Sequence, residues 1–271
     1  MNINNIHIRE ELPDDYHAVE ELTREAFWKT FWNKGQIICD EHLLVQLLRK
    51  TDAFIPELSL VAEISGRIVG HIIYSRGKVV GDSGTSHEML TFGPLSVLPS
   101  YQGMGIGKLL LQESLRLARY LGYRGVIIFR HPDYYTRFGM KPASDYGITT
   151  SDGKSFDPFM AYPLYDGALD GISGKFYPPD VYESLTQEDA LEFDKRFPKK
   201  EPHIPVPIDI LLERLEPTAC EAVKKLNFNY LAEMLTKSAR EMISLDGIDD
   251  KALAIVRKVM NEHSMQWGKI G

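Results

Sequence analysis

Apolar residues recur with two different periods along the first two thirds of the chain. After Asp40, leucines recur at helical spacing, whereas Leu58–Glu63 and Ile68–Tyr74 are extended apolar runs separated by Ser65-Gly66. The first pattern predicts an amphipathic helix, and the second predicts two strands joined by a tight hairpin. The same patterns predict a strand at Ile6–Arg9, a helix after Pro13–Asp15, a third strand of the meander, a helix from Ile106 to Leu121 and a buried strand at Val126–Phe129. This alternation indicates an α/β (α+β) protein.

Three glycines lie at the start of the long predicted helix. Gly103, Gly105 and Gly107 follow an apolar run and a short turn. Because glycine has no Cβ, the backbone N–H groups can approach an anion closely, and the helix N-terminus adds about half a positive charge. The segment Gln102–Lys108 therefore predicts a binding site for a phosphate ester.

The spacing of these glycines distinguishes between the known phosphate-binding loops. A P-loop needs Gly five residues before its Gly-Lys pair and Ser or Thr after the Lys, but Gln102 and Leu109 occupy these positions. The dinucleotide-binding fingerprint needs a third Gly where Lys108 or Leu110 stands. The pattern that remains, Gln-x-x-Gly-x-Gly, resembles the pyrophosphate-binding motif of the GNAT superfamily of acyl-CoA-dependent N-acyltransferases.

The order of the predicted elements extends this resemblance to about residues 3–182. A strand, two helices, a three-strand meander, the glycine-started helix and a buried strand follow each other as in GNAT proteins. Tyr135–Met140 resembles the Tyr-x-x-x-Gly-Phe segment that follows the fifth strand in many members, with Met in place of Phe. The resemblance, to one branch of uncharacterised bacterial GNAT proteins, implies a mixed, mostly antiparallel central sheet flanked by helices. Residues 157–177 would supply its closing strands.

The resemblance also implies a reaction and its residues. Acetyl-CoA would be the cofactor, and a primary amine would attack its thioester directly in a ternary complex. Tyr135 would be the general acid that protonates the leaving thiolate, and its neighbour Tyr134 could take the same role. The backbone of Leu95, Ser96 and Val97 would bind the acetyl and pantetheine groups. The pyrophosphate would be surrounded by Gln102, Gly103, Met104, Gly105, Ile106, Gly107 and Lys108.

The general base and the acceptor stay open. Some relatives carry a catalytic glutamate on the fourth strand, but Thr91 stands at that position here. The candidates for the general base are Glu88, His71 and His131. Alternatively, the proton leaves the amine through water. GNAT pockets accept small amines, polyamines and peptide or protein amines on one scaffold, so the fold does not define the substrate. A small-molecule or peptide amine is the expected acceptor.

The composition of the chain limits the partners and the cellular compartment that we expect. The formal net charge of −7 gives no electrostatic reason to expect a nucleic acid or an anionic membrane as partner. The first residues lack the pattern of a secretion signal, and no apolar run approaches about 20 residues. Cys39 and Cys220 are far apart, which suits a reducing cytoplasm and supports neither a disulfide framework nor a Cys-His metal site. We expect a cytoplasmic protein without a bound metal.

The chain changes character after residue 182. Residues 183–208 are first acidic and then rich in proline, which predicts a linker or strap between an acetyltransferase domain at 1–182 and a helical module at 209–271. Within the module, Leu245–Leu253 looks like the hairpin of a helix-hairpin-helix element. The module resembles the C-terminal domain of the bacterial RNA polymerase α subunit, which binds DNA and activators.

The charges of this module argue against DNA binding. The positions where that family contacts DNA hold Thr218, Glu221, Asp249 and Ala252, and only Lys251 matches. Residues 209–271 contain nine Lys or Arg and ten Asp or Glu, a balance of −1 that is poor for DNA binding. A protein-contact or dimer-forming appendage is expected. The alternative for the whole chain is a transcription-associated protein that senses acyl-CoA without turnover.

Overall fold

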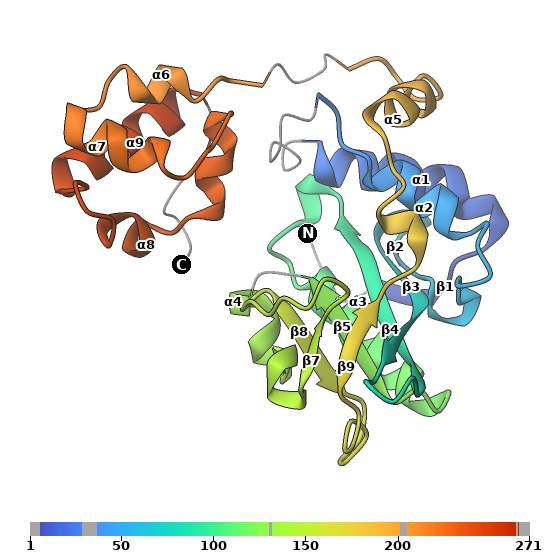
Figure 1. Ribbon diagram of the computed structural model, residues 1–271. Helices are drawn as coiled ribbons and strands as arrows, with labels where there is room; N and C mark the ends of the chain where they lie inside the picture. The colour runs from blue at the N-terminus through green and yellow to red at the C-terminus, as the bar shows by residue number, and fades with distance from the viewer. Residues whose placement is uncertain (1–5, 29–36, 130–131, 201–204, 264, 266–271) are drawn as a thin grey trace. The chain divides into compact units, whose positions relative to one another are not determined.

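A computed structural model describes residues 6–28, 37–129, 132–200, 205–263 and 265 (Figure 1). Contacts divide the chain into two compact units, with boundaries between Phe27 and Trp28, Cys39 and Asp40, and Asp189 and Ala190. The first unit contains the sheet, and the second contains the C-terminal helices. None of the helices in these described ranges has the length and apolar character that crossing a membrane requires.

The first unit is built on one mixed sheet. Neighbouring strands follow the order β1-β2-β3-β4-β5-β8-β6, and β9 pairs with both β3 and β7. All pairs are antiparallel except β4 with β5 and β7 with β9. The strands are β1 (Ile6–Glu10), β2 (Leu60–Ile64), β3 (Arg67–Val80), β4 (Ser86–Val97), β5 (Gly125–Phe129), β6 (Lys141–Pro142), β7 (Ile148–Thr150), β8 (Phe159–Pro163) and β9 (Gly174–Tyr177). The predicted mixed, mostly antiparallel sheet is confirmed.

The predicted hairpin between β2 and β3 has the expected turn. Ser65 and Gly66 adopt positive φ angles of 51° and 79°. Two successive residues with positive φ match the right-handed twist of the flanking strands, which is why such turns are favoured in two-residue hairpins. The turn sets the pairing of β2 with β3, and a register shift follows at Ala62/Glu63.

Helices cover both faces of this sheet. On one face, α1 (Tyr16–Phe27) and α2 (Glu41–Leu48) pack against Val61 and Ile73. On the other face lies α3 (Ile106–Tyr120), whose apolar side packs on the alternate strand positions. These positions include Leu60, Ala62, Ile72 and Tyr74. Residues Gly125 to Ile128 of β5 are buried, as expected for a strand between two covered faces.

A helix lies within the segment that the sequence suggested as a linker. This helix, α5 (Gln187–Asp194), begins after Thr186, whose hydroxyl accepts a hydrogen bond of 3.1 Å from the backbone N–H of Asp189. Ala190 and Phe193 are buried. Two of the acidic residues that the sequence assigned to a linker, Glu188 and Asp189, therefore stand in the first helical turn, where negative charge is favourable.

The second unit has its own apolar core, formed by short helices. Gly247, in the turn before α9, has a φ of +94°, and a Cβ there would lie 2.8 Å from the carbonyl oxygen of Thr218 in α7. This close approach requires a residue without a side chain. The helices of this unit are α6 (Asp209–Leu212), α7 (Pro217–Lys224), α8 (Ala239–Ile243) and α9 (Asp250–Glu262), with a 3₁₀ segment at Leu231–Thr236.

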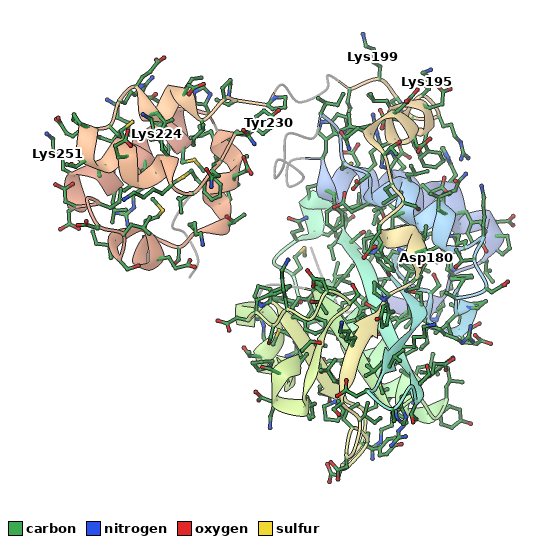
Figure 2. All side chains as sticks on the ribbon, viewed as in Figure 1. Asp180, Lys195, Lys199, Lys224, Tyr230 and Lys251 are labelled. Atoms are coloured by element: carbon green, nitrogen blue, oxygen red, sulfur yellow. The ribbon has the colours of Figure 1, made fainter. Side chains whose placement is uncertain are left out.

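Polar groups at or near the positions that the resemblance associates with DNA contact are engaged within this unit. Asp249 caps α9 by accepting a hydrogen bond of 2.8 Å from the backbone N–H of Ala252. Lys251 pairs with Glu216 at 3.1 Å, and Lys224 pairs with Glu221 at 2.9 Å on the exposed surface of the module (Figure 2). A phosphate would compete with carboxylates for both ammonium groups and for the N-terminus of α9.

Candidate active site

The strands β4 and β5 diverge after a short parallel contact. Leu90 and Val126 are the paired positions, whereas Leu95, Ser96 and Val97 continue β4 beyond the pairing. These last residues pair with β3 on one side, and on the other side no strand pairs with them within the described residues. The backbone groups of these residues that point away from β3 therefore have no strand partner and can bind a ligand, except the Val97 carbonyl, which accepts a hydrogen bond from the Gln102 side chain.

The glycine loop stands at the end of this open edge. Gly103 and Gly105 have φ angles of +76° and +85°, and Gly105 is the N-cap of α3. A Cβ on either glycine would meet no atom within 4 Å, so the loop faces open space. Gly107 lies in the first turn, and a Cβ there would be 3.5 Å from the hydroxyl of Tyr134. The loop therefore presents backbone N–H groups to an open volume at a helix N-terminus.

A pocket of about 330 Å³ occupies this volume. Three of the predicted cofactor residues do not line it: Leu95, Met104 and Ser96, whose buried hydroxyl donates to Thr23 of α1 at 3.0 Å. Seven of them do: Val97, Gln102, Gly103, Gly105, Ile106, Gly107 and Lys108. The glycine motif and the end of β4 thus meet at one cavity.

The side chain of Gln102 connects the glycine loop to β4. Its side-chain amide donates a hydrogen bond of 3.0 Å to the carbonyl oxygen of Val97. The bond ties the loop to the last residue of β4. The glutamine of the motif therefore holds the loop in place, and the N–H groups of the glycine segment are left to face the pocket.

The two candidate tyrosines occupy different places. Tyr134, in α4 (Pro132–Tyr135), is half-buried and lines the pocket. Burial raises the pKa of its phenol, an effect that outweighs the lowering by nearby Arg137, so the hydroxyl is a proton donor at neutral pH. Tyr135 is buried, and its ring centroid lies 5.8 Å from that of Phe92 in β4. Tyr134 is thus at the glycine loop, and Tyr135 is beside β4 near its divergence from β5.

Arg137 lines the same pocket, although the sequence analysis did not identify it as a candidate site residue. Its guanidinium carbon lies 4.1 Å from the centroid of the Tyr134 ring, and its Nε donates a hydrogen bond of 2.8 Å to the Tyr134 carbonyl oxygen. It lines the pocket together with Lys108, and neither cation has a carboxylate partner within the described ranges. The signal was a cation inside the Tyr-x-x-x-Gly segment, which places it one helical turn from the pocket tyrosine.

None of the described base candidates lines the pocket. Thr91 is buried in β4, and the exposed Glu88 lies 3.8 Å from Arg76 in a separate cavity. His71 is fully buried in β3, and its Nε2 lies 3.1 Å from the Ser59 hydroxyl. His131 lies outside the described residues. No group of His, Cys, Asp and Glu in the described part of the chain could hold a metal ion.

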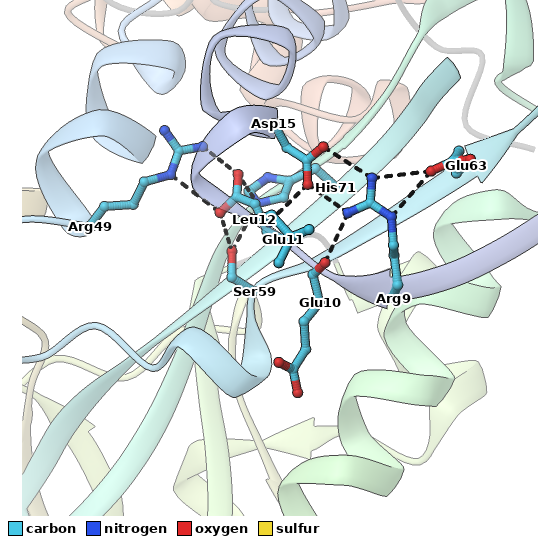
Figure 3. A network of polar contacts seen from close by, with 9 residues as sticks. All are labelled: Arg9, Glu10, Glu11, Leu12, Asp15, Arg49, Ser59, Glu63 and His71. Carbon is cyan, nitrogen blue, oxygen red and sulfur yellow. Dashed lines mark hydrogen bonds and ion pairs between the residues drawn. The ribbon is translucent and has the colours of Figure 1, made fainter. Parts of the chain in front are cut away.

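His71 belongs to a buried polar network (Figure 3). Arg49 joins the carboxylates of Glu11 and Glu20, and the Ser59 hydroxyl donates to Glu11 at 2.7 Å. Burial raises the pKa of Glu11, but the charges and hydrogen bonds of His71 and Arg49 outweigh it and lower the pKa to about 2. Because its Nε2 faces Glu11 and Ser59 in this network, His71 has a structural setting away from the glycine loop.

Comparisons with known proteins agree with this geometry. Residues 11–140 match the model of the Acetyltransferase (GNAT) family. The first unit has the GNAT fold. The uncharacterized N-acetyltransferase YhbS of Escherichia coli K12 is 29% identical over 168 residues, which cover 62% of this chain and 92% of YhbS. The uncharacterized N-acetyltransferase YjhQ of the same organism is 38% identical over 101 residues, 37% of this chain, and the chain spans only 55% of YjhQ's length.

Two solved structures are similar over most of their own length. The GNAT family N-acetyltransferase YhbS from Escherichia coli in complex with CoA has a TM-score of 0.58 and 25% identity, covering 69% of this chain and 96% of that one. A GNAT family acetyltransferase from Brucella melitensis in complex with acetyl-CoA has a TM-score of 0.53 and 29% identity. The similarity covers 66% of this chain and 98% of that one. Together with the family match, they support the GNAT acetyltransferase superfamily for this chain.

Proposed function

We propose that this chain transfers an acetyl group from acetyl-CoA to a primary amine. The observation that carries the proposal is the open glycine loop at the N-terminus of α3, beside the unpaired edge of β4. A diphosphate fits a helix N-terminus because its charge meets several backbone N–H groups. The two similar structures with CoA and acetyl-CoA support the same cofactor.

In this proposal each end of the cofactor has its own partners. The diphosphate accepts hydrogen bonds from the first turn of α3, with Lys108 and the Tyr134 hydroxyl as additional donors. The pantetheine arm runs along the backbone of Leu95–Val97, whose N–H and C=O groups on the side away from β3 bond its amides and the acetyl oxygen. The thioester then lies near Phe92 and Tyr135, where β4 and β5 diverge.

The chemical step needs two proton movements. The neutral amine nitrogen attacks the thioester carbon, the C–S bond breaks, and the amine loses a proton to water or to a base. We propose that the Tyr135 hydroxyl donates a proton to the departing sulfur, since a phenol is ordinarily protonated at neutral pH. The acceptor is a small-molecule or peptide amine, and the acidic net charge of −7 favours a cationic one.

A substitution in the glycine loop tests the cofactor site. Gly105→Glu places a carboxylate at the proposed diphosphate position, so we expect acetyl-CoA affinity, measured by calorimetry, to fall at least about a hundredfold. Gly84→Glu is the matched control, because Gly84 also has a positive φ (+81°) and no atom within 4 Å of an added Cβ, but lies between β3 and β4. Equal affinity of the Gly105→Glu variant and the unaltered chain would disprove the cofactor site.

Turnover separates the enzyme from an acyl-CoA sensor. We expect acetyl-CoA mixed with a library of amines, aminoglycosides and peptides to release free thiol with at least one acceptor. Tight acetyl-CoA binding without thiol release for any amine would favour the sensor instead.

For residues 209–271 we propose contact with a protein and not with DNA. The groups that would bind DNA phosphates are already engaged, because Lys224 and Lys251 pair with carboxylates and Asp249 caps α9. Retention of duplex DNA by the full chain at low salt would contradict this.

A further inference from the structure

A second pocket, lined by α3 and by residues 137–138, 162 and 164, shares one lining residue with the pocket of the glycine loop. It has a volume of about 460 Å³, and the residues with polar side chains in its lining are Gln112, Arg116, Arg119, Arg137 and Tyr162. Arg137 also lines the pocket of the glycine loop, so one side chain borders both cavities. We call this second cavity the arginine pocket. It has three cations and no carboxylate in its lining.

The three arginines differ in how they are engaged. Arg116 is held by both carboxylate oxygens of Glu113, at 3.0 and 2.6 Å. Arg137 uses its Nε on the Tyr134 carbonyl and stacks on the Tyr134 ring, which orients the guanidinium. Its two terminal nitrogens, and the guanidinium of Arg119, have no hydrogen-bond partner in the described parts of the chain. The pocket thus offers an oriented donor pair without a counter-charge.

We propose that the arginine pocket binds the phosphate on the 3′-hydroxyl of the CoA ribose. The inference rests on the proposed function, which places the diphosphate at Gly103–Lys108. The ribose follows the diphosphate on the side away from the pantetheine, so its 3′-phosphate is within reach of a group that borders both cavities. A phosphomonoester carries between one and two negative charges at pH 7, and a guanidinium can bind it through two parallel N–H donors.

The alternative for Arg137 is contact with the diphosphate alone. Its position in the lining of the first pocket allows that contact. The two possibilities differ in which part of the cofactor they require. A ligand without the 3′-phosphate, 3′-dephospho-CoA, keeps the diphosphate and therefore separates them.

Calorimetry with CoA and 3′-dephospho-CoA tests the inference on the full chain. We expect the unaltered protein to bind CoA about five- to tenfold more tightly than 3′-dephospho-CoA, as for one partly exposed charge-assisted contact. Arg137→Gln should reduce this preference to less than about twofold by weakening CoA binding only. Arg137→Lys keeps the charge but not the paired donors, and should give an intermediate preference.

Arg67→Gln is the control outside both cavities. Because Arg67 is exposed at the start of β3 and lines neither pocket, we expect the preference for CoA to persist in this variant. Equal binding of CoA and 3′-dephospho-CoA by the unaltered protein would overturn the inference and leave the proposed function intact. Equal weakening of both ligands by Arg137→Gln would overturn it as well and assign Arg137 to the diphosphate. If neither ligand binds, the proposed function fails together with the inference.

Discussion

Two polar regions of the first unit handle charge in opposite ways. In the buried network, Arg49 stands between the carboxylates of Glu11 and Glu20, and all three side chains are nearly inaccessible to solvent. At the glycine loop, Lys108 and Arg137 have no carboxylate partner in the described part of the chain and face open volume. A cation matched inside the protein indicates a structural role, whereas an oriented cation without a counter-charge indicates a place for an external anion.

Removing the cation of the buried network should have the largest effect. Arg49→Met leaves the carboxylates of Glu11 and Glu20 buried without their arginine, so the free energy of unfolding should fall by about 3–5 kcal/mol. Denaturant unfolding followed by circular dichroism measures this. Arg9→Met is the control, because Arg9 pairs with Asp15 and Glu63 at partly exposed positions and should cost about 1 kcal/mol or less. Similar losses in the two variants would contradict the comparison.

Acid should weaken the same network. The pKa of Glu11 is about 2 in the folded chain and near its ordinary value of 4.5 when unfolded. The stabilisation is therefore fully present above pH 4.5 and is lost as the pH falls toward 2, by about 3 kcal/mol. Unfolding curves of the unaltered chain and of Glu11→Gln should converge over this window. A difference that stays constant from pH 6 to pH 2 would exclude Glu11 as the titrating group.

The two tyrosines should separate chemistry from cofactor binding. Tyr135→Phe removes the proposed acid, so kcat should fall about a hundredfold while acetyl-CoA affinity changes little. Tyr134→Phe removes a proposed phosphate donor at the glycine loop and should weaken acetyl-CoA binding severalfold with kcat nearly unchanged. Steady-state kinetics with one acceptor, paired with calorimetry, distinguishes the two. The reversed pattern would exchange the roles of Tyr134 and Tyr135.

The first five strands, the helices α1 to α3 and the glycine loop were predictable because their signals are local, whereas the short strands β6 and β7 were not predicted. The β2–β3 hairpin needed only Ser65-Gly66 between two apolar runs, and the loop needed only glycines before a helix. The helix α5 was not predicted, because its acidic first turn and the prolines that follow resemble a linker. Arg137 was missed because its only signal was its position inside the Tyr-x-x-x-Gly segment, and a single exposed cation is usually a surface residue.

The buried network could not be predicted for a different reason. Glu11 is bonded to Arg49 and to Ser59, which are 38 and 48 positions away along the chain. Each of these residues alone is typical of a surface, and His71 alone was a plausible base candidate. Only the pairing of β2 with β1 and β3 and the position of α2 bring them together. Long-range charge pairing is a property of the fold, which no short window of sequence contains.

The smallest predicted effect concerns Gly107, where stability and binding should move in opposite directions. A Cβ at this position would lie 3.5 Å from the Tyr134 hydroxyl and 3.7 Å from a Val97 methyl, which are ordinary contact distances. Gly107→Ala should therefore raise the free energy of unfolding by up to about 1 kcal/mol, because alanine favours the helix. Its methyl group occupies part of the pocket, so CoA affinity should fall severalfold.

In contrast to Gly107→Ala, Gly105→Ala should lower the free energy of unfolding. Gly105 has a φ of +85°, so alanine there should cost about 1 kcal/mol. Thermal unfolding and calorimetry on both variants measure the two quantities together. If Gly107→Ala is more stable and binds CoA with unaltered affinity, the ligand does not pass in front of the first turn of α3. The anion that the unpaired cations indicate would then have to lie elsewhere along the loop.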